Sequence, residues 1–189
     1  MRCLTKRRLQ FYIYNLALRQ FPEEKYADLK KANNFYTTTI LVLASAVQKL
    51  SRVTKIEPGM RLYRGISADV NLPELFIASD EHGCTGFTEW AFMSTTSNMQ
   101  VALRYSKPQI SAGSRNRPTL LVFVAGSVDR GADIRAYSQY PQEEEFLFVP
   151  CSFVERTGEG IIQVTPDAGI VNKVPVKVSL LFSKHFEHS

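Results

Sequence analysis

The sequence predicts an α+β domain in which helices come first and an antiparallel sheet system follows. Residues 1–56 carry apolar side chains at the three-and-four spacing of helices, whereas β-branched and aromatic runs between turn signals dominate residues 57–189. With 189 residues, of which 44% are hydrophobic, the chain can bury a substantial core. We therefore expect a single domain, 1–189, with a helical N-terminal part (1–56) and a β-rich core (57–189).

Two helices are expected in the N-terminal part. The first covers Lys6–Gln20, where apolar residues recur along one face, and Pro22 ends it. The second covers Tyr26–Leu50, although the run Thr37–Thr39 weakens it and is the expected place for a break.

The strands are expected from Met60 onward, each rich in β-branched or aromatic residues. They are Met60–Arg64, Phe92–Thr95, Leu120–Ala125, Phe146–Pro150, Ser152–Arg156, Ile161–Thr165 and Val174–Leu181. Residues Thr157–Gly160, between two of these strands, are typical of a tight hairpin turn.

One further helix and one loop are expected among the strands. The helix starts at Ser97 or Asn98, because either side chain can cap it. Its inward-facing residues are expected to be Val101, Ala102 and Tyr105. The loop is Lys107–Pro118, whose Ser, Gly, Arg and Pro residues favour irregular structure.

Charge, cysteines and hydropathy exclude several settings. Apart from a basic opening segment, the net charge of +5 is scattered among acids, so we expect no nucleic-acid partner. The cysteines lack metal-ligand spacing and fit reduced intracellular thiols, although Cys84 and Cys151 could also pair. The N-terminus lacks the apolar core of a secretion signal, and the longest apolar stretch, Ile40–Val47, is too short to span a bilayer.

Three consecutive acids, Glu143–Glu145, directly precede the apolar run Phe146–Val149. Because side chains alternate along an extended chain, Glu143 and Glu145 are expected on one side and Glu144 on the other. Two such carboxylates repel each other unless a positive charge lies between them, and a reaction through an oxocarbenium-like sugar would supply that charge. A solvated acidic loop ahead of an edge strand is the alternative interpretation.

Two other segments combine polar groups with strand ends. Arg64, at the end of a strand, offers a planar fork of donors suited to phosphate, and Gly65 would let a ligand approach the backbone. Consecutive hydroxyls begin at Ser94, where they could hold a carboxylate, a ribose or a helix N-terminus. Taken singly, an Arg-Gly step is usually a structural salt bridge with a turn, and a Ser-Thr run is usually a helix cap.

The three segments together form an ordered pattern. In chain order they are Tyr63-Arg64-Gly65, Phe92-x-Ser94-Thr95-Thr96 and Tyr140-Pro141-Gln142-Glu143-x-Glu145. This order resembles the arginine, serine, glutamate pattern of arginine-specific mono-ADP-ribosyltransferases of the cholera-toxin-like class, and it covers roughly Met60–Pro150. The resemblance implies N-terminal helices packed on a split antiparallel β-sandwich, with NAD as co-substrate and no metal.

The resemblance also implies which residues bind NAD. They would be Tyr63, Arg64, Gly65, Ser94, Thr95, Thr96, Tyr105 and Glu145. Arg64 would bind phosphate, and the main chain of Gly65 would bind the nicotinamide amide. Ser94 would hydrogen-bond the catalytic glutamate and help hold the nicotinamide ribose. Thr96 stands where many members of the family carry a second serine.

The remaining implied roles concern the reaction and the acceptor. Glu145 would engage the ribose 2'-hydroxyl and stabilise positive charge as nicotinamide leaves, whereas Glu143 would orient and help deprotonate the incoming guanidinium. The residues presenting the substrate would be Tyr137, Tyr140, Gln142 and Glu143. The loop Lys107–Pro118 lacks the aromatic residue that some family members place beside nicotinamide, so Tyr105 or Phe92 is expected to serve.

The resulting hypothesis is transfer of ADP-ribose from NAD to arginine on a target protein, with Arg64, Ser94, Glu143 and Glu145 in catalysis. The alternatives are an NAD glycohydrolase and an inactive NAD-binding module. We expect a monomer without a membrane span, either cytoplasmic or delivered as an effector. Glu89 is expected in a salt bridge at the rim of the sheet and Trp90 in the core. The three histidines, His82, His185 and His188, are expected at the surface.

Overall fold

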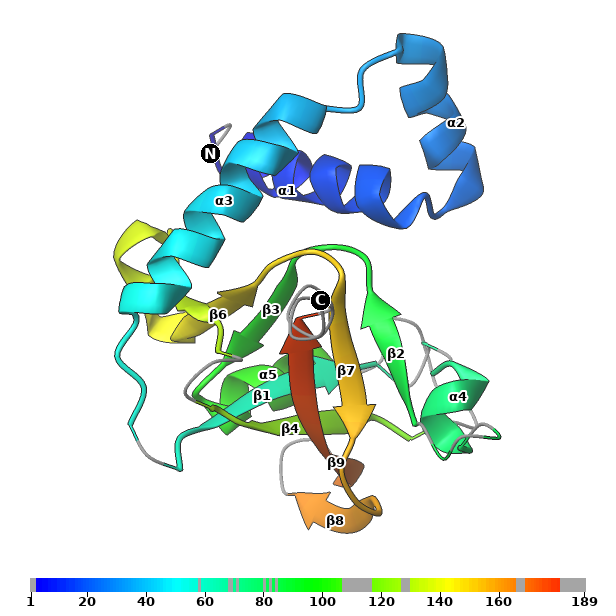
Figure 1. The fold of residues 1–189 in the computed structure, drawn as a ribbon, viewed down its shortest axis with the longest axis vertical. Helices are drawn as coiled ribbons and strands as arrows, with labels where there is room; N and C mark the ends of the chain where they lie inside the picture. Colours follow the sequence, from blue (N-terminus) through cyan, green and yellow to red (C-terminus); the bar gives the residue numbers. More distant parts are fainter. Residues whose placement is uncertain are drawn as a thin grey trace, which may run out of the picture.

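The computed structural model describes residues 3–57, 59–67, 70, 72–79, 81, 83, 85–106, 117–126, 130–165 and 169–180 (Figure 1). Three helices, α1 (Cys3–Arg19), α2 (Glu23–Ala32) and α3 (Thr37–Val53), form the upper layer of the molecule in Figure 1. The strands lie below them.

The expected helix Lys6–Gln20 corresponds to α1, and two helices, α2 and α3, occupy the range of the expected helix Tyr26–Leu50, in line with the break expected near Thr37–Thr39. The chain breaks before the threonine run. Asn33 ends α2 in the left-handed region with φ of 48°, and its N–H binds the carbonyl of Lys30. Tyr36 precedes α3 with φ of 53°, so no regular helix can pass through these positions.

In the part of the chain that the structure describes, nine strands follow the helices. They are β1 (Arg61–Ile66), β2 (Gly86–Glu89), β3 (Met93–Thr96), β4 (Thr119–Val124), β5 (Ala132–Asp133), β6 (Glu145–Phe148), β7 (Ser152–Arg156), β8 (Ile161–Thr165) and β9 (Gly169–Leu180). Short helices lie between them, namely α4 (Glu74–Ile77), α5 (Met99–Ser106) and the 3-10 helices η1 (Arg135–Tyr137) and η2 (Pro141–Glu143). Each expected strand has a counterpart, whereas β2 and β5 are additional.

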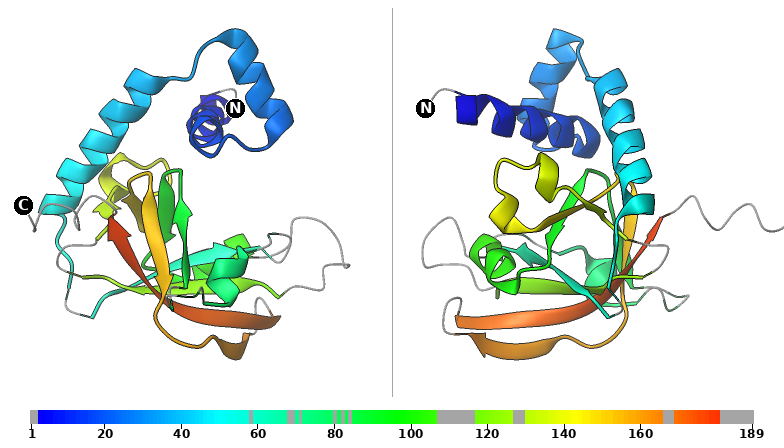
Figure 2. Two further views of the ribbon diagram at one scale, coloured as in Figure 1. Left: turned by 45° about the vertical axis from the view of Figure 1, so that its right-hand side comes forward. Right: turned by 90° about the vertical axis from the view of Figure 1, so that its left-hand side faces the viewer.

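The strands pair in the order β2-β7-β9-β4-β1-β3-β6-β5, and β8 pairs with β9. All pairs are antiparallel except β4 with β9, which is parallel. Figure 2 shows β9 curving from the layer of β1 and β4 into that of β7, and the pairing agrees, because β4 pairs along residues 172–176 and β7 along 176–180. The predicted α+β architecture with a folded, mostly antiparallel sheet is therefore confirmed.

The expected hairpin turn at Thr157–Gly160 is wrong. Both β7 and β8 pair with β9, β7 along its second half and β8 along its first half. Arg156 lies opposite Val176 and Ile161 opposite Lys173, so the intervening residues form a bulge along one edge of β9. The two glycines in this segment signal irregular backbone but do not reverse the chain.

The main core lies between the two layers of strands. Its buried residues are Leu62, Phe76, Met93, Leu121, Phe123, Phe146, Phe148, Val154, Val174, Val176 and Val178. A second cluster joins the helices to the sheet, with Ile40 and Val47 of α3 packed with Phe92, Ala132 and Leu147. These contacts fix the helical layer over β3 and β6, next to the segments singled out by sequence.

Several local expectations need revision. Tyr105 is not turned into the core, since it is 55% exposed, whereas its neighbours Val101 and Ala102 are buried. Trp90 is 56% exposed, because the following Ala91 and Phe92 occupy the interior instead. The three histidines and the loop residues 107–116 lie outside the described residues. Of the helices that are described, none is long and apolar enough to cross a membrane.

Candidate active site

A cavity of about 500 Å³ opens beside the junction of β1 and β3. Its walls come from these two strands, from α5, from the segment that leads into β6, and from α1. The lining residues are Phe11, Tyr63, Arg64, Gly65, Ser94, Thr95, Thr96, Val101, Ala102, Tyr105, Tyr140, Glu143 and Glu145. The three motif segments, distant in the chain, thus meet around one space.

The cavity exists because β1 and β3 barely pair. Within these strands a single register pair joins them, Tyr63 with Thr96. Next to it, the Arg64 side chain reaches β3 and donates a hydrogen bond from Nη1 to the Ser94 carbonyl at 2.9 Å. The Arg64 side chain therefore connects β1 to β3 at the place where the pairing of their backbones ends.

Gly65 has a steric role at this opening. A Cβ atom there would lie 2.0 Å from the carbonyl oxygen of Ala102 and 2.9 Å from the nitrogen of Ser106. Both contacts are with the backbone of α5, which cannot yield as a flexible side chain could. The close packing of α5 on β1 therefore requires glycine and exposes the strand backbone to the cavity.

Arg64 is largely buried, with 23% of its side chain exposed. Burial lowers the pKa of its guanidinium, Glu89 opposes that effect and Arg19 adds to it. An arginine remains charged through such a shift. The cavity therefore contains a desolvated cation, which attracts an anion more strongly than a solvated one does.

Glu89, at the end of β2, is the ion-pair partner of this arginine. Its carboxylate accepts hydrogen bonds from Arg64 Nη2 at 3.3 Å and from Nε and Nη2 of Arg19, each at 3.0 Å. The backbone N–H of Ala91 donates a further bond at 3.1 Å. Glu89 was expected in a salt bridge at the rim, but only 10% of its side chain is exposed, so its carboxylate is buried while the two arginines are partly exposed.

The acidic segment turns sharply before β6. Glu143 ends η2, Glu144 adopts a left-handed conformation with φ of 47°, and Glu145 begins β6. The Ser97 hydroxyl donates a hydrogen bond to the Glu144 carboxylate. Glu143 and Glu145 line the cavity and Glu144 does not, as expected, but the cause is the left-handed turn and not alternation along a strand.

The two cavity carboxylates influence each other. Burial raises the pKa of Glu145, a hydrogen bond with Ser94 opposes this, and the nearby charge of Glu143 raises it further. Tyr105 donates a hydrogen bond from its hydroxyl to Glu143 Oε1 at 2.9 Å. Among the described residues, no lysine or arginine pairs with either carboxylate, so this side of the cavity favours a cationic ligand.

The threonines after Ser94 hold the site together. Thr95 donates its hydroxyl hydrogen to the Phe146 carbonyl at 2.9 Å, and Thr96 donates to the Glu143 carbonyl at 2.6 Å. The Thr96 oxygen also accepts the N–H of Asn98 at the start of α5. Both hydroxyls thus bind backbone, fixing the acidic segment relative to β3.

Three of the expected residues lie away from the cavity lining. Phe92 is buried against Phe11, with ring centroids 6.3 Å apart, so it cannot stack on a ligand in the cavity. Tyr137 is 76% exposed on η1, and Gln142 is exposed on η2. Tyr140, from the same segment, does reach the cavity.

Sequence reasoning missed Phe11 and Arg19 altogether and assigned Glu89 to the rim. Arg19 and Glu89 are 70 positions apart, and no local pattern marks them as partners. The available signal is an acidic residue at the end of a short strand, Glu89, a few positions before the hydroxyl motif. For the described part of the chain, no three His, Cys, Asp or Glu side chains cluster as a metal site would require.

No protein-family model and no curated protein matches the chain. Solved structures do match it. One match is the ADP-ribosyltransferase Vis, a toxin from Vibrio splendidus, with 22% sequence identity and a TM-score of 0.57. The match covers 90% of this chain and 67% of the Vis chain. ADP-ribosyltransferase HopU1 of Pseudomonas syringae pv. tomato DC3000 has 25% identity and a TM-score of 0.51, covering 75% of this chain and 55% of its own.

Exoenzyme S from Pseudomonas aeruginosa, solved with human 14-3-3 protein beta and Carba-NAD, has 17% identity and a TM-score of 0.51. That match covers 93% of this chain and 79% of the other. The chain spans little more than half the length of HopU1. At these identities the likeness shows the fold, and the chain has the fold of bacterial ADP-ribosyltransferases.

Proposed function

We propose that this chain is an NAD-dependent mono-ADP-ribosyltransferase that modifies arginine side chains of a target protein. One observation supports this most strongly: a buried guanidinium and two carboxylates without cationic partners among the described residues face the same cavity. The pyrophosphate of NAD would bind the guanidinium, and the positive charge of an arginine acceptor would lie beside the two carboxylates. The likeness to ADP-ribosyltransferases supports the same activity.

In this proposal Arg64 binds the pyrophosphate and anchors NAD. Glu145, which is hydrogen-bonded to Ser94, accepts a hydrogen bond from the ribose 2'-hydroxyl. Its negative charge stabilises the positive charge that develops at the anomeric carbon. The bond from that carbon to nicotinamide breaks, and its electron pair leaves with neutral nicotinamide. Little activation of the leaving group is needed, so placement and charge supply most of the catalysis.

The acceptor arginine approaches from the side of Glu143. A nitrogen of its guanidinium forms the new bond to the anomeric carbon, and Glu143 takes up the proton that this nitrogen loses. Tyr105 keeps Glu143 in place through its 2.9 Å hydrogen bond. The exposed Tyr137 and Gln142 belong to the surface that would meet a protein acceptor. Vis has been solved with agmatine, a small guanidinium compound, which supports this class of acceptor.

Hydrolysis of NAD is a second candidate for the same site. Water could replace the guanidinium as the attacking group without any change at Glu145. An inactive module that only binds NAD is a third. The delivery of the chain as an effector is part of the proposal, in line with the description of Vis as a toxin.

The deciding experiment measures nicotinamide release from NAD with and without agmatine, and analyses the agmatine by mass spectrometry. A transferase releases nicotinamide and yields agmatine carrying one ADP-ribose. Release without the adduct would identify a glycohydrolase and reject the transferase. Absence of release under both conditions would leave only the inactive module.

A further inference from the structure

The helical layer contributes to the site at the middle and at the C-terminal end of α1. At the middle of the helix, Phe11 lines the cavity and packs on Phe92. At its last residue, Arg19 reaches down to the sheet and holds Glu89 through two parallel hydrogen bonds of 3.0 Å. Neither contact involves residues of the main core, which lies between the strand layers.

The carboxylate of Glu89 is shared between two arginines unequally. Arg19 binds both of its oxygens in a bidentate arrangement, whereas Arg64 makes one longer contact of 3.3 Å. Bidentate arginine–carboxylate pairs are the stronger kind. Arg19 is therefore the main counterion of Glu89, and Arg64 is a secondary one.

This sharing sets the charge presented to a ligand. Two arginines and one carboxylate leave a net charge of about +1 at the buried end of the cavity. If Arg19 were absent, Glu89 would pair with Arg64 alone, and the pair would be neutral. A phosphate would then have to compete with a buried carboxylate for the same guanidinium.

We propose that Arg19 and Glu89 are positioning residues for the dinucleotide, in which Arg19 neutralises Glu89 and thereby leaves the charge of Arg64 available for the pyrophosphate. This inference rests on the proposed function only in taking a pyrophosphate as the ligand of Arg64. It makes α1 a working part of the site, since that helix supplies both the counterion and, through Phe11, a wall.

The first test is ADP-ribose binding, measured by titration calorimetry, because ADP-ribose carries the pyrophosphate and binding needs no turnover. Arg19→Met should weaken binding about tenfold, the size of one weakened charge-assisted hydrogen bond. Arg19→Lys retains the charge and should stay within about threefold of the wild type. In nicotinamide release, the loss should appear in KM for NAD more than in kcat.

The second test asks whether Arg19 acts through Glu89. With Glu89→Gln in place, adding Arg19→Met should cost no further affinity, because there is no carboxylate left to compete for Arg64. The double variant should therefore bind ADP-ribose as well as Glu89→Gln does and better than Arg19→Met. The comparison of the double variant with Glu89→Gln can be made even if Arg19→Met alone fails to fold.

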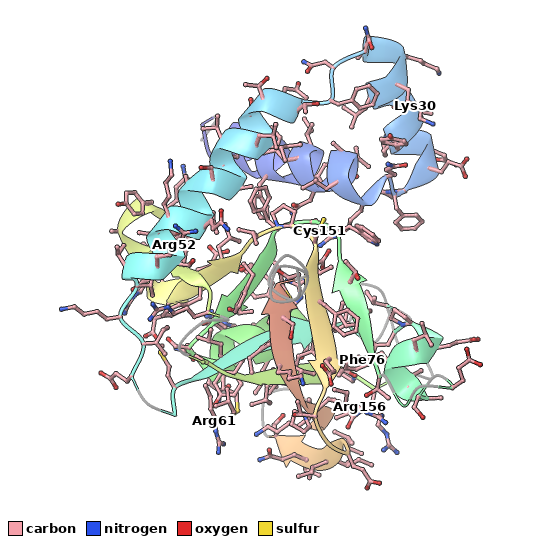
Figure 3. All side chains as sticks on the ribbon, viewed as in Figure 1. Lys30, Arg52, Arg61, Phe76, Cys151 and Arg156 are labelled. Carbon is pink, nitrogen blue, oxygen red and sulfur yellow. The ribbon has the colours of Figure 1, made fainter. Side chains whose placement is uncertain are left out.

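Arg52→Met is the matched control, since Arg52 lies on α3 at the surface (Figure 3) and its loss changes the net charge by the same amount. It should bind ADP-ribose as the wild type does. Equal affinity of Arg19→Met and wild type would overturn the inference, as would a further loss from Arg19→Met in the Glu89→Gln background. If the variants differ in ADP-ribose binding as expected but the protein releases no nicotinamide from NAD, only the proposed function is refuted.

Discussion

The two ends of the cavity treat charge in opposite ways. At one end, Arg64 is buried with a counterion already supplied, because Glu89 and Arg19 complete a network of hydrogen bonds. At the other, Glu143 and Glu145 both line the cavity with no basic partner among the described residues. The first end therefore has a counterion within the protein, whereas the described part of the chain supplies none for the second.

The largest expected effect is on the acidic end. Glu145→Gln should lower nicotinamide release by about a thousandfold, because the amide cannot stabilise the developing positive charge. The matched control is Glu144→Gln, which removes an adjacent carboxylate that binds Ser97 outside the cavity. Steady-state assays of both variants check this, and equal losses from the two would mean that the cavity is not the reaction site.

The second effect separates the two carboxylates. Glu143→Gln should lower transfer to agmatine by about a hundredfold, because the acceptor loses its proton-accepting group. Hydrolysis of NAD should fall by less than about tenfold, since Glu145 alone serves the bond-breaking step. The ratio of adduct to free ADP-ribose is the measurement. A uniform fall in both products would contradict distinct roles.

The third effect tests the cationic end through stability. Arg64→Met should lower the free energy of unfolding by about 2 kcal/mol, because it removes charged hydrogen bonds to Ser94 and Glu89. The control is Arg61→Met on the same strand, an exposed residue (Figure 3), which should change stability by less than about 0.5 kcal/mol. Denaturant titrations give both free energies of unfolding. An Arg64→Met variant as stable as the wild type would show that the hydrogen bonds of Arg64 do not stabilise the fold in the absence of a ligand.

The fourth prediction is a gain in stability, in contrast to the loss expected from Arg64→Met. Burial and Glu143 raise the pKa of Glu145 above that of the unfolded chain, so folding favours the protonated form. The associated stability is fully present below the unfolded pKa and is lost as pH rises through the folded pKa. Glu145→Gln should therefore stabilise the protein at neutral pH, by about 1 kcal/mol. This gain in stability over the wild type should become smaller in acid. Thermal unfolding of both proteins at neutral and acidic pH measures it, and equal stability at neutral pH would contradict the prediction.

The smallest effect concerns pH and activity. Because the pKa of Glu145 is raised, nicotinamide release should decline in acid from a higher pH than an ordinary carboxyl would cause. In Glu143→Gln the decline should move to lower pH, since the neighbouring charge that raises the pKa is gone. The pH dependence of kcat/KM for NAD compares the two, and coinciding profiles would mean that the carboxylates do not interact.

The sequence predicts the components of the site better than their arrangement. Arg64, Ser94 and Glu145 stand out because each is a polar residue in or beside an apolar run, although Arg64 lies within β1 and not at its end as predicted. Glu89 and Arg19 do not, because an ion pair across 70 positions leaves no periodic trace. The left-handed turn at Glu144 is equally hidden, since glutamate has no preference for that conformation.

The errors in the fold have similar causes. Thr157–Gly160 has the composition of a reversal, but the twelve residues of β9 are long enough for β7 and β8 to pair along it in succession. Periodicity found the apolar residues of α3 but not the interruption at Asn33, which depends on one residue adopting a left-handed conformation. Local composition therefore identifies elements, whereas pairing partners depend on contacts between distant segments.

Since α1 closes one side of the cavity, ligand occupancy and local opening of that helix are thermodynamically linked. A dinucleotide that needs Phe11 and Arg19 in place binds only the closed arrangement and so shifts the population toward it. Amide hydrogens of α1 should exchange more slowly with ADP-ribose bound, while those of α2, whose residues do not line the cavity, should change less. The N-terminal helix would then report occupancy from outside the β-rich core.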